Sequence, residues 1–288
     1  MSTIDTSMIA PESNSAQQHT RIEPQRGWIG VNVGEIWRYR DLLFLLVWRD
    51  FTSRYRQSVI GVGWALIRPM ISMIVFTIVF GRMAKLPSDG IPYPIFNYTA
   101  LLPWMFFSSC FTGSSNSLVS GGSLITKVYF PRLILPLSKV VIGLVDLAIQ
   151  FFFLAILMCW YGIVPTWGIL CIPLFLLMSV ITALSVGLWM TSLNVKYRDI
   201  GHMVPFMTSI WMWMTPIVYS SSIVSEKWKF LYAINPLVGV IDGFRWALLG
   251  SRTPDWSMMA VSLTVAMLAF VGGLLFFRRT ESQIADYV

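Results

Sequence analysis

Long stretches without a charged side chain constrain this chain more than any other feature of its sequence. Residues 90–126, 147–195, 200–225 and 256–277 contain no Asp, Glu, Lys or Arg. A helix needs about 20 mostly apolar residues to cross a bilayer, and each stretch is long enough. Only 12% of the chain is charged and 56% is apolar, whereas soluble domains carry about 25% charged residues. We therefore expect an integral membrane protein, and not a soluble enzyme, a disordered chain or a disulfide scaffold.

The charge-free stretches predict an all-α integral membrane protein with six transmembrane helices. The longest stretch contains the turn sequence YGIVP at 161–165, so it supplies most of two helices. A further apolar stretch carries a single charge, Arg68, near one end. The expected spans are about 61–81, 96–119, 135–160, 168–193, 204–224 and 256–277.

Basic residues predict how these spans are oriented, because cytoplasmic loops are enriched in Lys and Arg. With the N-terminus in the cytoplasm, 15 of the 21 Lys and Arg residues lie on the cytoplasmic side. We therefore expect a multi-pass protein of the bacterial cytoplasmic (inner) membrane with both termini cytoplasmic. The net charge of +7 is assigned to this asymmetry and not to nucleic-acid binding. The polar residues 1–33 predict a disordered cytoplasmic tail, 34–280 the membrane domain and 281–288 a cytoplasmic C-terminus.

Three further segments do not fit a simple span. In 35–56, the apolar run 42–48 is too short to cross a bilayer, which predicts a helix lying in the cytoplasmic interface. The link SGGSLITKVYFPRL at 120–133 combines aromatic and basic residues, which indicates a protein interface, although packing against headgroups is an alternative. The segment 225–250 is apolar but interrupted, which predicts two short re-entrant helices or, alternatively, an interfacial cap.

Catalytic and metal-binding patterns are missing from the sequence. It contains no G-x-x-x-x-G-K-[ST] phosphate loop, so we expect that ATP is not hydrolysed by this chain. His19 and His202 stand alone, and no His or Cys pair has the spacing of a metal site. Lys139 and Asp146 lie at i and i+7 of the third expected span, a spacing that would let them pair. We therefore expect no enzyme, no catalytic residue, no metal and no cofactor in this chain.

Aromatic rings and small polar side chains share the second and fifth expected spans. Sugar rings have apolar faces and polar rims, so this mixture suits a sugar chain that slides past exchangeable contacts. The alternative is that the rings face lipid and the small residues pack helices together.

Four segments in order resemble the permease (transmembrane) subunit of ABC-type polysaccharide exporters. These exporters move O-antigen (the outer part of lipopolysaccharide), capsule or teichoic-acid chains. The similarity extends over about 35–280. The segments are RYRQSVIGVGWALIRPM (54–70), LLPWMFFSSCFTGSSNSLVSGGSLITKVYFPRLILPLSKV (101–140), NVKYRDIGHMVPF (194–206) and INPLVGVIDGFRWALLG (234–250).

The resemblance implies a half-transporter. Two permease copies would form a channel for a lipid-linked polysaccharide, and two separate ATP-binding subunits would hold ATP and Mg. It also implies a coupling helix at about 124–132 that contacts the ATP-binding subunit through Lys127, Val128, Tyr129, Phe130 and Arg132. The candidates for an aromatic channel lining are Trp104, Phe106, Phe107, Trp211 and Trp213.

Three other functions fit an apolar chain of this kind. The first is an ABC permease for drugs or other small molecules. The second is an ion-driven flippase for lipid-linked sugars, which would need no ATPase. The third is a membrane enzyme such as an acyltransferase, but the sequence lacks a His/Asp pair or carboxylate cluster near the interface.

Overall fold

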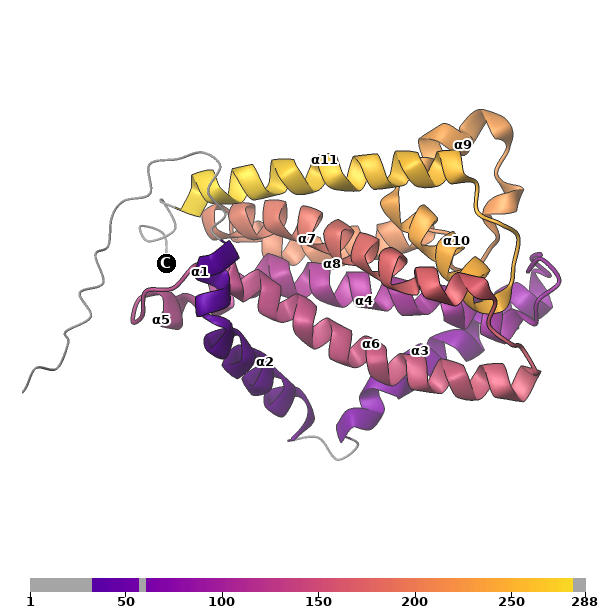
Figure 1. Cartoon of the computed structure of the whole chain (residues 1–288), viewed down its shortest axis with the longest axis horizontal. Helices are drawn as coiled ribbons and strands as arrows, with labels where there is room; N and C mark the ends of the chain where they lie inside the picture. Colours follow the sequence, from indigo (N-terminus) through magenta and orange to yellow (C-terminus); the bar gives the residue numbers. More distant parts are fainter. Residues whose placement is uncertain (1–32, 57–60, 282–288) are drawn as a thin grey trace, which may run out of the picture. The chain divides into compact units, whose positions relative to one another are not determined.

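The computed structural model describes residues 33–56 and 61–281, and the regular elements in these two ranges are all helices (Figure 1). The expected all-α class is confirmed. Apart from Val33, the tail expected at 1–33 lies outside the described residues. The same holds for the C-terminus expected at 281–288, apart from Glu281.

The segment expected as an interface helix forms two helices, α1 (Val33–Arg38) and α2 (Arg40–Tyr55). The first expected span follows as three consecutive segments of different helix type. They are the 3₁₀ turn η1 (Gly61–Gly63), the α-helix α3 (Trp64–Phe76) and the π-helix η2 (Thr77–Met83).

The helix α4 (Tyr93–Ser120) is the centre of the bundle and is buried along most of its length. It packs against α6 (Ile134–Tyr161), α7 (Ile172–Lys196) and α10 (Pro236–Leu249), while α11 (Trp256–Glu281) packs along α7 (Figure 1). Small residues permit these close approaches, as is common between membrane helices.

The two ends of the bundle carry different short helices (Figure 1). One end, called the α5 end here, carries α5 (Gly122–Ile125) and the last turn of α11. The opposite end, called the α9 end, carries α9 (Glu226–Ala233) and the 3₁₀ turns η3 (Trp167–Cys171) and η4 (Ser221–Ile223). The two short helices predicted within 225–250 are present as α9 and α10. Their depth in a membrane stays a prediction.

Among the described residues, four segments are long and apolar enough to cross a membrane. They are Gly61–Met83, Ile134–Tyr161, Trp167–Lys196 and Trp256–Glu281, and they match the first, third, fourth and sixth expected spans. The second, α4, is 28 residues long but is rich in polar side chains.

The fifth expected span, 204–224, is wrong in extent. The helix there, α8 (Asp199–Trp213), has 15 residues and is about 22 Å long, short of a hydrocarbon core of about 30 Å. Pro216 disfavours helical geometry at the residue before it, and the chain runs irregularly from 214 to 220. The count of six spans is therefore not confirmed.

Candidate functional site

The loop after α5 is the first candidate site. The helix expected over 124–132 is shorter than predicted, because α5 ends at Ile125 and a loop continues to Leu133. Lys127, Val128 and Tyr129 are exposed on this loop, and Tyr129 has 65% of its surface accessible. These three side chains are free to contact another protein.

The end of this loop is tied back to the bundle. Phe130 is only 4% exposed, so its ring packs inward. The guanidinium of Arg132 donates a hydrogen bond to the carbonyl of Glu281 at the end of α11, and the Arg132 backbone N–H donates to a Glu281 carboxylate oxygen. The five predicted coupling residues thus divide into three that face outward and two that position the loop. Their role at an ATP-binding subunit stays a prediction.

The predicted channel aromatics do not lie on one surface. Trp104, Phe106 and Phe107 are buried inside the chain. Trp211 is half-buried, packs edge-on against Phe107 at 5.0 Å between ring centroids and donates to the carboxamide oxygen of Asn235. In this chain, these four rings are packing groups.

Trp213 differs from the other four, because 54% of its surface is accessible. It lies on α8 with Phe206 and Ile210, at helical spacing, and all three side chains are exposed. An aromatic channel lining stays a prediction. The best candidate for it is the exposed face of α8 that Phe206, Ile210 and Trp213 form. Sequence reasoning missed the difference because apolar and small polar residues are mixed around the whole circumference of α4, which therefore shows no preferred face.

Two ion pairs join α2 to α6. Asp146 accepts hydrogen bonds from the guanidinium of Arg54 and the hydroxyl of Tyr55, and the Lys139 ammonium donates to Asp50. A pair between Lys139 and Asp146, which their spacing suggested, is therefore not formed. Burial raises the pKa of Asp50, but the nearby Lys139 and Arg49 outweigh it and hold the pKa below its ordinary value. Asp50 stays ionised at neutral pH, and its pair with Lys139 persists.

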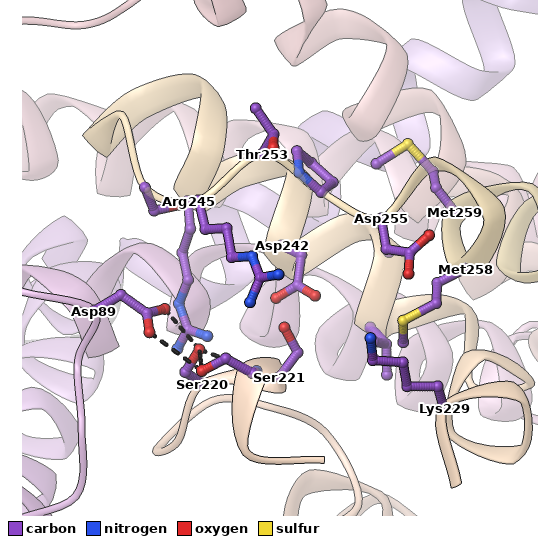
Figure 2. A pocket seen from close by; sticks show the side chains of 16 residues that line it. Asp89, Ser220, Ser221, Lys229, Asp242, Arg245, Thr253, Asp255, Met258 and Met259 are labelled. Atoms are coloured by element: carbon purple, nitrogen blue, oxygen red, sulfur yellow. Dashed lines mark hydrogen bonds between the residues drawn. The ribbon is translucent and has the colours of Figure 1, made fainter. Parts of the chain in front are cut away.

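A polar cavity of about 260 Å³ lies at the α9 end, between α10, the loop after it and the segment around Ser220 (Figure 2). Asp89 accepts hydrogen bonds from the hydroxyls of Ser220 at 2.6 Å and Ser222 at 3.2 Å. Asp242 lies beside Ser221 and the guanidinium of Arg245 (Figure 2).

Arg245 supports the irregular segment that follows α8. Its side chain is only 2% exposed and donates to the carbonyls of Ile217 at 2.8 Å, Tyr219 at 3.2 Å and Phe96 at 3.4 Å. The guanidinium also lies 3.6 Å from the centroid of the Phe96 ring. Non-helical backbone within a membrane protein is tolerated where the protein satisfies its polar groups, and Arg245 does so here. The signal in the sequence was an Asp and an Arg, three residues apart, within an otherwise apolar helix.

Residues 41–249 match the model of the ABC-2 type transporter family. An O-antigen export system permease protein RfbA from Myxococcus xanthus is 30% identical over 253 residues, which cover 86% of this chain and 96% of that protein. An RfbA from Klebsiella pneumoniae is 28% identical over 256 residues, covering 85% and 94%. The polysialic acid transport protein KpsM from Escherichia coli is 21% identical over 262 residues, covering 85% and 95%.

Replacing Arg245 should destabilise the α9 end. In Arg245→Met, three carbonyl groups lose a buried donor, and each unsatisfied group costs about 1–3 kcal/mol. We expect a melting temperature several degrees lower in detergent and less protein in membranes. Arg252→Met is the matched control, because Arg252 lines the same cavity but is exposed. Equal melting temperatures for the two variants would contradict the role assigned to Arg245.

Proposed function

The chain belongs to the ABC-2 type transporter family, and we propose that it is the membrane subunit of an ATP-driven polysaccharide exporter. The observation that carries this proposal is the nearly end-to-end match to O-antigen export permeases. The match includes the loop after α5 and the short helices α9 and α10. An ABC permease for drugs or other small molecules is the less supported alternative, because the named relatives transport polysaccharides.

The proposed transporter contains two copies of this chain and two ATP-binding subunits. Membership of the family supports the ATP-binding partners, which would supply ATP and Mg²⁺. We place their docking site on the α5 end, where Lys127, Val128 and Tyr129 are exposed. An exposed aromatic ring beside a cation suits a protein interface, where aromatic side chains carry much of the binding energy.

This docking site also gives the proposed orientation. The α5 end would face the cytoplasm of a bacterial cell, where ATP is present, and the α9 end would face outward. The termini would then both be cytoplasmic. The last turn of α11 carries Arg278 and Arg279, in agreement with the enrichment of basic residues on the cytoplasmic side.

A lipid-linked polysaccharide is the proposed substrate, and a channel between two permease copies is the proposed route. The face of α8 that exposes Phe206, Ile210 and Trp213 is the candidate wall. A sugar ring can lie against an indole while its hydroxyls reach polar groups or water. Behind this wall, the half-buried ring of Trp211 packs against the buried ring of Phe107 and so joins α8 to α4, while Trp104 and Phe106 are buried within the bundle.

Loss of the chain should abolish polysaccharide on the surface of its host cell. We expect surface polysaccharide to fall to background and lipid-linked polysaccharide to accumulate inside, because synthesis continues without export. Surface and intracellular glycan are measured in a deletion strain, and a plasmid-borne copy serves as the control. Unchanged surface polysaccharide in the deletion strain would contradict the proposal and favour the small-molecule alternative.

Replacing Tyr129 should weaken docking of the ATP-binding subunit. Truncating an interface anchor costs about 2 kcal/mol, or roughly 30-fold in affinity, so Tyr129→Ala should reduce co-purification of the two proteins. Trp228→Ala is the matched control, since Trp228 is equally exposed at the α9 end. Phe130→Ala is unsuitable because the ring of Phe130 is buried. Co-purification of Tyr129→Ala at the level of Trp228→Ala would show that the docking site lies elsewhere.

A further inference from the structure

A second cavity, of about 620 Å³, lies among α2, α3, α4 and α6. It is distinct from the polar cavity at the α9 end and from the loop after α5. Its volume lies within the range of roughly 300–1,000 Å³ that is typical of small-molecule sites. The lining residues that bear on its chemistry are Arg54, Arg68, Ser108, Ser109, Thr112 and Gln150.

The cavity carries an unbalanced positive charge. Its charged side chains are two arginines, Arg54 and Arg68, and one acid, Asp146. Asp146 is already paired with Arg54 and also accepts from Tyr55. Arg68 has no hydrogen-bond or ion-pair partner in the part of the chain that the structure describes. A cation within a membrane-spanning helix is costly and is usually paired, so the cavity favours an anion.

The Ser and Thr side-chain hydroxyl groups that line the cavity also lack hydrogen-bond partners among the described residues. Ser108, Ser109 and Thr112 use no side-chain hydroxyl in a hydrogen bond to residues 33–56 or 61–281. Further along the same helix, by contrast, the hydroxyls of Ser114, Ser115 and Ser117 donate to backbone carbonyls. Free hydroxyls therefore gather at the part of α4 that faces the cavity.

Gln150 supplies an independent signal. The residue is only 6% exposed, and its side-chain oxygen Oε1 has no hydrogen-bond partner among the described residues. A buried polar atom without a partner costs free energy, which a ligand with a hydroxyl donor would recover. Gln150 lies one turn beyond Asp146 on α6, so both side chains are on the same face of the helix.

The surroundings point to a lipid as the source of this ligand. Arg68 shares a face of the first span with Ile71, Val75 and Ile78, which are all exposed. A phosphate held by Arg68 would leave an acyl or prenyl chain lying along these three side chains. The helix α2, which the sequence predicts to lie in the membrane interface, contributes Arg54 and Tyr55 to another wall of the cavity.

We propose that this cavity binds a membrane lipid whose headgroup joins a phosphate to a hydroxylated group. Arg68 contacts the phosphate, while Gln150 and the hydroxyls of α4 contact the hydroxylated part. The lipid is either an anionic phospholipid of the bilayer or the lipid-linked glycan itself. Only the assignment to the lipid-linked glycan rests on the proposed function.

The test measures lipid binding to the purified full-length chain by native mass spectrometry. The probes are short-chain phosphatidylglycerol, a short-chain prenyl phosphosugar and, as the zwitterionic comparison, phosphatidylcholine. We expect Arg68→Gln to weaken binding of the anionic probes about tenfold or more and Arg68→Lys to restore part of it. Arg82→Gln, an exposed arginine of the same span outside the cavity, should bind as the wild type does.

Each result decides the proposal. An Arg68-dependent preference for phosphatidylglycerol assigns the site to a bilayer lipid, and one for the prenyl phosphosugar assigns it to the substrate. Equal binding of all three probes, or equal affinities for Arg68→Gln and the wild type, overturns the proposal, and Arg68 then only reaches to the membrane surface.

Matching melting temperatures of Arg68→Gln and the wild type show that the variant is folded. Ser108→Ala tests the site independently, and we expect it to bind the anionic probes more weakly than the wild type does. If this proposal failed while deletion still abolished surface polysaccharide, the proposed function would stand.

Discussion

The buried guanidinium of Arg245 donates to the carbonyls of Ile217, Tyr219 and Phe96, and the α9 end depends on this interaction. A chain that leaves the helix within apolar surroundings must pair its backbone groups internally. Tyr93 donates to Val218, and the Asn235 amide donates to Met214, so neighbouring carbonyls are satisfied in the same way. These contacts allow α8 to stop at Trp213 and place α10 beside α4.

Two ion pairs elsewhere in the bundle satisfy charged side chains internally in the same way. Asp50 and Arg54 of α2 face α6, because their partners, Lys139 and Asp146, lie on that helix. These pairs fix α2 against the bundle, and the pair of Arg54 with Asp146 lines the cavity that contains Arg68.

The sequence predicted the elements whose signals are local. Apolar length located four long helical segments, and the turn at 161–165 separated α6 from α7, where Gly162 adopts a left-handed conformation (φ 64°). The span at 204–224 failed because Pro216 ends the helical geometry and because the carbonyls beyond it are satisfied by distant side chains. The aromatic channel lining was only partly predictable from the sequence. Whether a ring is buried, as that of Trp104 is, or exposed, as that of Trp213 is, depends on which helices surround it. The inward direction of Phe130 likewise depends on the contact between Arg132 and Glu281.

The central claim is that this chain provides the membrane path and that a separate subunit provides the energy. Its most direct test is transport of a lipid-linked polysaccharide in proteoliposomes that contain the chain with or without its ATP-binding subunit. The account predicts ATP hydrolysis and movement of glycan across the bilayer only when both proteins and ATP are present. Glycan movement by the chain alone, or movement driven by an ion gradient in the absence of ATP, would contradict it.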